Sequence, residues 1–334
     1  MARLYTQNID MEKLRIVYFG TPEFAASQLE AIIAAGYDVA AVVTMPDKPS
    51  GRGKKIQFSD VKKTALEHQL PLLQPEKLKN PEFLEELASF NANLFIVVAF
   101  RMLPTVVWQM PKYGTFNLHA SLLPQYRGAA PINHAIINGE TETGLTTFFL
   151  NEEIDKGAVI MRETVAIRPD ETAGELHDEL MILGNKVVVE TIRKIESGTI
   201  PTQTQEELAA GAKLHDAPKI FKDFCYIDWN KKLNDIYNHI RGLSPYPAAH
   251  ALLVSDEGES LEMKVYASEM EPCQPTEPIG SIITDNKKFL KVAVADGYLH
   301  LTTVQQAGKK SMYIEDFLRG QRFEGTWKVG KHEF

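Results

Sequence analysis

Residues 14–44 of this chain read LRIVYFGTPEFAASQLEAIIAAGYDVAAVVT. The apolar run over 14–19 predicts a buried strand, and the apolar spacing over 23–35 predicts a helix. A second apolar run over 39–44 predicts the next strand. A strand, a helix and a strand in this order are typical of a parallel sheet with right-handed crossover connections. This stretch therefore predicts an α/β fold.

The turn after the first strand, Gly20-Thr21-Pro22, can be compared with the turn of a dinucleotide-binding site. Dinucleotide-binding sheets carry three glycines here, which let the backbone approach the pyrophosphate. This turn lacks the second and third of them, which disfavours a dinucleotide oxidoreductase. Thr21 and Pro22 are instead suited to the N-cap and the first position of the helix that follows.

The remaining apolar segments extend this sheet. Residues 92–100 form an almost unbroken apolar run, as expected of a central parallel strand covered on both faces. Further strands are predicted over 115–119 and 144–150, and helices over 132–138 and 173–197. We therefore expect a Rossmann-like, mostly parallel sheet with flanking helices.

The character of the sequence changes from residue 220. A helix is predicted over 229–241, and five short β-prone segments follow, at 249–254, 261–266, 280–284, 290–294 and 298–304. Closely spaced strands separated by turns favour a smaller β-barrel, and five strands fit an OB-like one. We expect a catalytic domain over 11–202, a linker over 203–219 and an OB-like domain over 220–334.

Composition sets further bounds on the 334-residue chain. No apolar run approaches the roughly 20 residues that span a bilayer, so we expect no membrane contact. The two cysteines, Cys225 and Cys273, form neither a disulfide framework nor a metal-ligand pattern, which suits the cytoplasm. The net charge of −8 argues against bulk non-specific binding of nucleic acid but not against local basic patches. Residues 1–10 are polar and precede a second methionine, Met11, which indicates either an alternative start or an added leader. The chain is expected to be a monomer.

Asn117 and His119 are the first candidate site residues. They lie two apart in the predicted strand 115–119, so their side chains point to the same side of the sheet. An amide can donate to a developing oxyanion, and an imidazole can move a proton near neutral pH. A polar strand end with a structurally satisfied histidine remains the alternative at this point.

Asp155 is the third candidate. It lies in a glycine-terminated loop after the strand 144–150, whose end we expect at the same edge of the sheet as His119. A carboxylate beside an imidazole fixes its tautomer, and the three groups together could stabilise the oxyanion of an acyl transfer. No Gly-x-Ser-x-Gly turn supplies a covalent nucleophile, which favours direct attack by an amine. By itself, Asp155 could equally be a turn residue.

A basic segment follows the second strand. Residues 45–55 are rich in proline and glycine and are predicted to be irregular. Between Lys48 and Lys63 there are six basic residues and one acid. The segment is either a solvated loop or a mobile arm that contacts the phosphates of a nucleic acid.

Three of these motifs carry a resemblance to a known family. The sequences FGTPEF at 19–24, PDKPSGRGKK at 46–55 and NLHASLLPQYRGAAPI at 117–132 resemble those of the methionyl-tRNA formyltransferases, which belong to the folate-dependent formyltransferases. Weaker matches are IDW at 227–229, SPYP at 244–247 and AGKK at 307–310. The similarity covers nearly the whole chain from residue 14.

The resemblance implies transfer of a formyl group from 10-formyltetrahydrofolate, without a metal, to the α-amino group of methionyl initiator tRNA. The product is N-formylmethionyl-tRNA for translation initiation, in the cytoplasm. The alternatives are a formyltransferase for an amino sugar nucleotide, and an RNA-binding module with a degenerate sheet domain. The basic arm and the C-terminal barrel favour the tRNA enzyme among these readings.

The resemblance also assigns residues. It implies that the catalytic set is Asn117, His119 and Asp155, that the folate pocket is lined by Ser121, Leu122, Leu123 and Pro124, and that the tRNA is contacted by Arg52, Lys54 and Lys55, with help from the C-terminal domain. One departure concerns the aspartate loop. The family usually has Asp-Thr-Gly-Asp there, whereas this chain has Asp155-Lys156-Gly157-Ala158.

Overall fold

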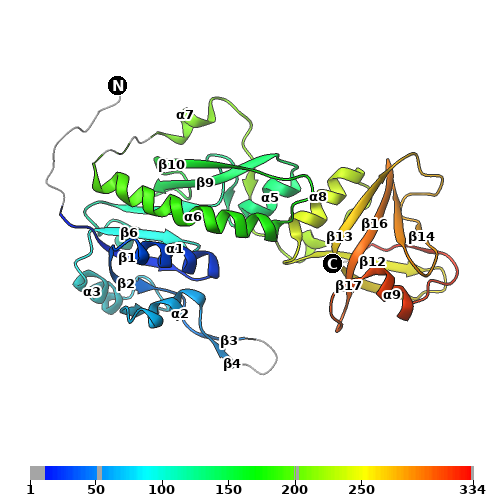
Figure 1. Cartoon of the computed structure of the whole chain (residues 1–334), viewed down its shortest axis with the longest axis horizontal. Helices are drawn as coiled ribbons and strands as arrows, with labels where there is room; N and C mark the ends of the chain where they lie inside the picture. The colour runs from blue at the N-terminus through cyan, green and yellow to red at the C-terminus, as the bar shows by residue number, and fades with distance from the viewer. Residues whose placement is uncertain (1–11, 51–54, 199, 201–202, 332–334) are drawn as a thin grey trace. The chain divides into compact units, whose positions relative to one another are not determined.

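The computed structural model describes residues 12–50, 55–198, 200 and 203–331 (Figure 1). The chain divides into two compact units. The first takes residues up to 128, together with 144–165 and 177–216, and the second takes 129–143, 166–176 and 217–334.

The first unit is built on a seven-stranded sheet with the strand order β10-β9-β7-β6-β1-β2-β5. The strands are β1 Arg15–Gly20, β2 Asp38–Val43, β5 Leu72–Leu73, β6 Leu94–Val98, β7 Thr115–His119, β9 Glu142–Phe149 and β10 Val159–Ala166. The neighbours from β5 to β7 run parallel, and β9 runs antiparallel to β7. The predicted mostly parallel sheet is confirmed.

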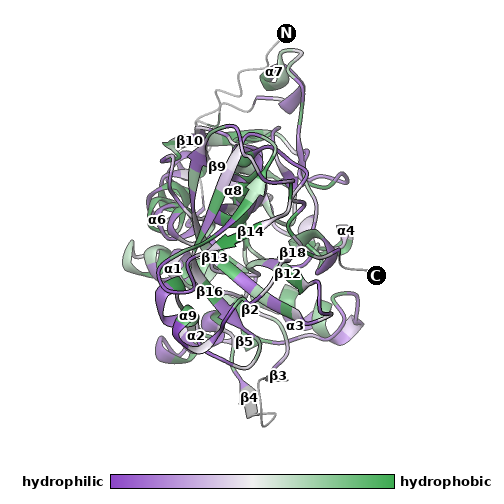
Figure 2. Cartoon of the chain, turned by 90° about the vertical axis from the view of Figure 1, so that its right-hand side faces the viewer, coloured by the Kyte–Doolittle hydropathy of each residue, from purple (hydrophilic) through white to green (hydrophobic). Residues whose placement is uncertain are grey.

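Helices cover both faces of this sheet because its central strands are apolar on both sides. Val17 and Phe19 of β1 share a buried cluster with α3 (Pro81–Ser89) and α4 (Thr105–Trp108). On the other face, the Tyr18 hydroxyl donates to the backbone oxygen of Ala25 in α1 (Glu23–Ala34) at 2.6 Å. The long helix α6 (Ala173–Glu196) lies beside α1, and its ribbon carries both hydrophobic and hydrophilic colours (Figure 2). All five residues of β6 are buried, as its apolar run predicted.

Two local predictions were wrong. The helix α1 begins at Glu23, as its apolar spacing predicted, but its N-cap is Pro22, which makes no side-chain capping bond, so Thr21 is not the N-cap and Pro22 is not the first helical residue. The basic segment is not irregular throughout, because β3 (Lys48–Ser50) pairs antiparallel with β4 (Lys55–Gln57) (Figure 1). Paired backbone groups at the two ends of a hairpin override the local preference of proline for irregular structure. The helix α2 (Asp60–Glu67) follows, capped by the Ser59 side chain.

The second unit contains an antiparallel sheet with the order β14-β15-β16-β13-β12-β18, and β17 pairs with β16. Its strands are β12 Ala249–Ser255, β13 Ser260–Pro272, β14 Ile282–Thr284, β15 Leu290–Val294, β16 Gly297–Gln306, β17 Met312–Tyr313 and β18 Trp327–Val329. The amide of Val329 donates to the oxygen of Gly280 at 2.9 Å, which brings the two ends of the sheet together. The predicted small barrel is confirmed as a nearly closed one, with the short strands β17 and β18 in addition.

Helices close one side of the barrel core. The helices of this unit are α5 Pro131–Ile137, α8 Leu233–Leu243 and α9 Ile314–Gly320, with a 3-10 turn at Asp223–Cys225. Helix α8 buries Ile236 and Ile240 in the barrel core, which also contains Trp229 and Trp327. Gly242 lets α5 approach α8 closely, since a Cβ there would lie 2.5 Å from Ile137. The remaining short elements are α7 Gln205–Ala209, β8 Arg127–Gly128 and β11 Asp216–Ala217.

His239 on α8 is a buried histidine in this unit. Its side chain is 8% exposed, its ring lies 5.4 Å from that of Phe224, and its Nε2 has no hydrogen-bond partner among the described residues. Burial lowers the pKa of His239 to about 4. In the unfolded chain the ordinary histidine pKa applies, so the unfolded state takes up this proton first as the pH falls.

We therefore expect the His239 contribution to stability to be complete above about pH 6.5 and to be lost as the pH falls toward 4. Between pH 7 and pH 5, the difference in free energy of unfolding between the wild-type chain and His239→Asn should shrink by about 2 kcal/mol. Urea titrations at both pH values measure it. Gln109→Asn, which changes an exposed side chain that does not titrate, serves as a control whose difference stays constant. An unchanged His239→Asn difference would contradict the prediction.

Candidate active site

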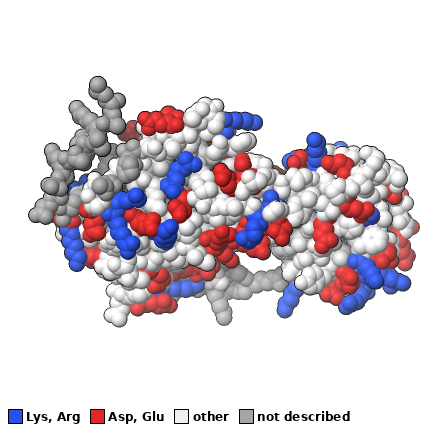
Figure 3. Space-filling model, turned by 45° about the horizontal axis from the view of Figure 1, so that its top comes forward, with Lys and Arg blue, Asp and Glu red and all other residues white. Residues whose placement is uncertain are grey.

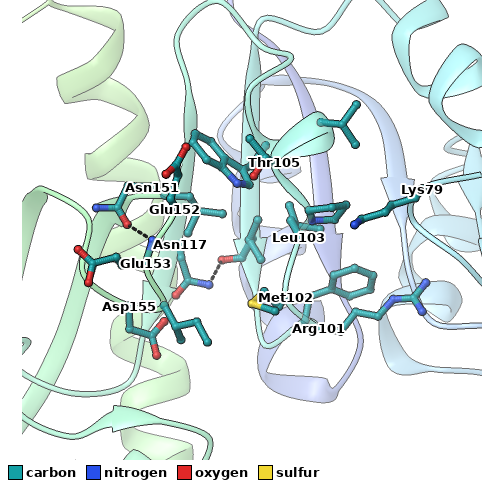
Figure 4. A pocket seen from close by; sticks show the side chains of 17 residues that line it. Lys79, Arg101, Met102, Leu103, Thr105, Asn117, Asn151, Glu152, Glu153 and Asp155 are labelled. Carbon is teal, nitrogen blue, oxygen red and sulfur yellow. Dashed lines mark hydrogen bonds between the residues drawn. The ribbon is translucent and has the colours of Figure 1, made fainter.

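A cleft of about 600 Å³ lies beside β6 and β7 in the first unit. One wall is the segment that follows β6, residues 100–108, and the other is the loop after β9, residues 150–155 (Figure 4). Asn117 and Asp155 both line it, so two of the three candidate residues from distant parts of the chain meet at one cavity. The volume is in the usual range for a small-molecule site.

Asn117 is held by the neighbouring strand. It lies opposite Val97 in the parallel register of β6 and β7, and its Nδ2 donates to the Val97 oxygen at 3.1 Å (Figure 4). The second N–H and the oxygen of the amide have no partner among the described residues. Because the side chain lines the cleft, one N–H remains able to donate to a bound molecule.

His119 is buried two residues further along β7 and is 8% exposed. Its Nε2 lies 2.9 Å from the backbone oxygen of Tyr126. A carbonyl oxygen only accepts, so Nε2 carries the proton and donates, and Nδ1 is the ring nitrogen without a hydrogen-bond partner in the described part of the chain. The side chain is not among those that line the cleft.

Asp155 lies in the cleft, but the strand before it does not end at the edge of the sheet where the sequence predicted. Because β9 runs antiparallel to β7, its last residue Phe149 pairs with Phe116, at the start of β7 and not at its end. The loop 150–157 then runs back along the sheet. The Oδ2 of Asp155 accepts a hydrogen bond from the amide of Gly128 at 3.1 Å. No hydrogen bond joins Asp155 to His119 in the described structure; both are bonded to the backbone of residues 126–128.

The substituted aspartate loop is stabilised within itself. Lys156 donates a hydrogen bond to Glu153, and this contact lowers the pKa of the Glu153 carboxyl. Gly157 is required by close packing, since a Cβ there would lie 1.5 Å from the backbone oxygen of Phe149. Lys156 therefore points to Glu153, and a glycine at position 157 meets a steric requirement of the loop.

The segment Ser121–Pro124 forms a buried turn directly after His119. The Ser121 hydroxyl donates to the oxygen of Gln125 at 2.6 Å, and the amide of Leu123 donates to the Thr146 hydroxyl at 3.0 Å. Ser121 and Leu123 are fully buried, and Leu122 is partly exposed. None of the four residues is among those that line the cleft.

The mouth of the cleft is apolar and exposed. Met102 is 73% exposed, Ile154 is 63% exposed and Val106 is also exposed, although all three are large apolar side chains. Arg101, beside them, donates through Nη1 to the oxygen of Glu76 at 2.8 Å and through Nη2 to that of Pro75. Burial lowers the pKa of its guanidinium. Apolar side chains around a few fixed polar groups are typical of a small-molecule site.

The charged residues of the basic arm are only partly described. Arg52 and Lys54 lie outside the described residues, and the backbone of Lys55 begins β4. On the face drawn in Figure 3, lysine and arginine are interspersed with aspartate and glutamate and do not form one continuous basic area.

Two further searches cover only the described residues. No group of three or more histidine, cysteine, aspartate or glutamate side chains there is arranged to hold a metal ion. No helix in the same part of the chain has the length and apolar character needed to cross a membrane.

Family models place the chain in a class. Residues 13–192 match the model for a formyl transferase, and residues 219–322 match that for the formyl transferase C-terminal domain. These two ranges cover most of the chain. The chain belongs to the formyl transferase family.

Relatives narrow the class further. The chain is 54% identical to the methionyl-tRNA formyltransferase of Bacteroides fragilis over 318 residues, which covers 95% of this chain and 98% of the relative. It is 51% identical to the methionyl-tRNA formyltransferase of Flavobacterium johnsoniae over 319 residues, 96% of this chain and the whole relative.

Solved structures share the fold. The sugar 3N-formyl transferase WlaRD, solved in the presence of dTDP and 5-N-formyl-THF, superposes with a TM-score of 0.61 at 19% identity and covers 90% of this chain and all of its own. HypX from Aquifex aeolicus, in complex with tetrahydrofolic acid, gives a TM-score of 0.57 at 18% identity, over 91% of this chain and 46% of its own. At such identities the likeness shows the fold alone.

Two site residues, Ile154 and Gln205, were not predicted from the sequence. Ile154 looks like an ordinary core residue in a linear sequence, and only its exposure marks it as part of a cleft. Gln205 lies in a polar stretch expected to be a linker, yet it is 1% exposed and bonded to the aspartate loop. A buried glutamine in a linker has no local sequence signal, because its partners lie far away in the chain.

We expect Gly157→Ala to destabilise the fold by about 1–3 kcal/mol, because its new methyl group must displace the backbone around Phe149. Gly320→Ala is the matched control, since a Cβ at Gly320 meets no atom within 4 Å. Urea unfolding followed by circular dichroism measures both. Equal stability of the two variants would show that the loop does not need this glycine.

Proposed function

We propose that this chain transfers a formyl group from 10-formyltetrahydrofolate to the α-amino group of methionyl initiator tRNA, which gives N-formylmethionyl-tRNA. The observation that carries the proposal is the 54% identity to a methionyl-tRNA formyltransferase over 95% of the chain. The position of Asn117 and Asp155 in one cleft supports it. The experiment is an incubation of the chain with both substrates and detection of formylmethionine.

The acceptor proposed here is preferred over an amino sugar. The relatives at 49–54% identity over nearly the whole chain carry the name methionyl-tRNA formyltransferase. The sugar formyl transferases are 16–19% identical to this chain, and this likeness shows only that the fold is shared. A dTDP-linked amino sugar offered as the acceptor in the same assay should give no product.

The cleft fits a reduced folate in size and chemistry. Met102, Val106 and Ile154 would pack on its flat ring system, and the segment Ser121–Pro124 would border the site through its partly exposed Leu122. The folate supplies an activated formyl carbon. The acceptor amine supplies the nucleophile, and the residues of the chain stabilise the developing charge and move the proton.

In the proposed reaction the free N–H of Asn117 donates to the formyl oxygen, where negative charge develops as the amine attacks. The new bond joins the methionyl nitrogen to the formyl carbon, and the bond from that carbon to the folate nitrogen breaks. The proton lost by the amine passes to the released folate nitrogen. His119, through Nδ1, would hold or relay this proton, and the Asp155 carboxylate would stabilise the positive charge.

The proposal also assigns regions. Residues 11–202 would form the catalytic domain, 203–219 the linker and 220–334 an OB-like domain that assists tRNA binding. Arg52, Lys54 and Lys55 would contact phosphates near the acceptor end of the tRNA. Because the other substrate is a tRNA used in translation, the site of action would be the cytoplasm.

We expect Asn117→Ala to lower kcat about 10²–10³-fold, since it removes an oxyanion donor worth about 3 kcal/mol. His119→Ala should lower kcat about 10²–10⁴-fold through loss of proton transfer. Initial rates of formylation at saturating folate and tRNA measure both. Gln109→Ala, which changes an exposed residue outside the cleft, is the control. Near-normal turnover in both site variants, with normal circular dichroism, would remove the proposed roles.

Replacing Arg52, Lys54 and Lys55 together with alanine should weaken tRNA binding and lower the salt dependence of its affinity. Each lost phosphate contact reduces the slope of log K against log salt by about 0.7–0.9. Filter binding of initiator tRNA at several KCl concentrations between about 50 and 300 mM measures the slope. Lys112→Ala removes an exposed lysine elsewhere in the first unit and should leave it unchanged. The same slope in the triple variant would exclude the arm as a tRNA contact.

A further inference from the structure

Gln205, the first residue of α7, is buried although it stands in a polar segment. Its side chain is 1% exposed, whereas its neighbours Thr204 and Glu206 are exposed. A buried amide is costly unless its donors and acceptors are paired. The contacts of this side chain therefore show what holds it in the interior.

The Gln205 amide is fully hydrogen-bonded between two parts of the first unit. Its Nε2 donates to the backbone oxygens of Asp155 at 2.8 Å and Gly157 at 3.0 Å. Its Oε1 accepts from Nε of Arg127 at 3.0 Å and from Nη2 of the same guanidinium at 2.6 Å. Two carbonyls on one side and a guanidinium on the other allow only one orientation of the amide.

Asp155 is therefore held from two directions by the same dipeptide. The amide of Gly128 donates to its Oδ2, and the preceding Arg127 holds its backbone through Gln205. Asp155 itself has a φ of +53°, a left-handed conformation that a residue with a side chain seldom adopts. External bonds on both the carboxylate and the backbone compensate for this unfavourable conformation.

The segment that carries Gln205 is anchored independently of the amide. Gln203 exchanges two backbone hydrogen bonds with Val159 at the start of β10, at 2.9 and 3.1 Å. Thr204 and Glu207 form a capping box at the beginning of α7. Because these bonds fix the backbone beside Gln205, a change in its side chain should loosen the aspartate loop without releasing α7.

We propose that Gln205, fixed by Arg127, is a positioning residue that sets the place of Asp155 in the cleft. This inference rests on the proposed function, because that function includes the role of Asp155 in the reaction. Gln205 does not line the cleft, so it acts through the loop and not on a substrate. Removal of its two donors frees the backbone of residues 155–157, and the Asp155 carboxylate then no longer stays at one position.

A double-mutant cycle tests this coupling in the full-length chain. Gln205→Met keeps the length of the side chain and removes its four hydrogen bonds, and Gln205→Glu keeps the acceptor for Arg127 but loses both donors. Both variants should lower kcat about 10–100-fold and change KM for methionyl-tRNA by less than about threefold. The control is Glu206→Gln, an exposed neighbour on the same helix, which should retain normal kcat.

The decisive comparison is made in an Asp155→Asn background. If Gln205 acts through Asp155, adding Gln205→Met to Asp155→Asn should lower the residual rate by less than about twofold, so the losses are not additive. Losses that multiply would overturn the proposal, because a merely structural glutamine would weaken both forms of the enzyme equally. Normal kcat in both single Gln205 variants would overturn it as well.

A second measurement needs no substrate. Hydrogen–deuterium exchange of Gln205→Met should become faster at the Gly128 amide and in residues 150–157, and stay as in Glu206→Gln over the rest of the first unit. If the wild-type chain formylates no methionyl-tRNA, the proposed function fails, whereas the exchange result still decides the positioning role. Unchanged exchange in the loop, or faster exchange throughout the unit, would show that Gln205 does not position it.

Discussion

The parallel pairing of β6 with β7 is the constraint on which the site depends. The register sets Asn117 opposite Val97, and the carbonyl of Val97 uses one of the two N–H groups of the amide. The amide is thereby oriented with its remaining N–H available in the cleft. The same pairing places the segment after β6, with Arg101 and Met102, along the wall of that cleft. One ladder of backbone hydrogen bonds thus supplies both the polar group and the apolar surface.

The antiparallel strand β9 makes the second wall possible. A parallel strand would have ended at the opposite end of β7, but β9 ends beside Phe116 and its loop returns along the sheet. This return needs the close approach of Gly157 to Phe149 and the unusual backbone of Asp155. The loop is kept in place by residues remote in the chain, with Gly128 on its carboxylate and Gln205 on its carbonyls.

The net charge of the chain does not show where its charged residues lie. The chain carries a net charge of −8, and its cleft contains both Lys79 and Arg101 and the acids of the 150–155 loop. Lys156 is committed to Glu153, within that loop. The overall field of this negatively charged protein repels a polyanionic substrate. Attraction of such a substrate would therefore have to come from local groups such as the basic arm. The binding of the small substrate would rely on shape and on a few hydrogen bonds.

Much of this could be read from the amino-acid sequence. The order of an apolar strand, a helix and a second apolar strand over 14–44 predicted the parallel sheet, and the spacing of Asn117 and His119 predicted that both side chains leave β7 on one side. These properties are local, since strand and helix periods are set by covalent geometry. The motifs around 117–132 likewise identified the family before any contact was known.

Only the tertiary structure decided the direction of β9, the bond from Gly128 to Asp155 and the burial of Gln205. Each of these depends on groups 27 to 78 residues apart in the chain, which pack together only when the sheet has formed. Glutamine and glycine have no periodic signal that indicates such partners. The chemistry of the candidate groups was therefore encoded locally, whereas their geometry came from hydrogen bonds between distant segments of the backbone.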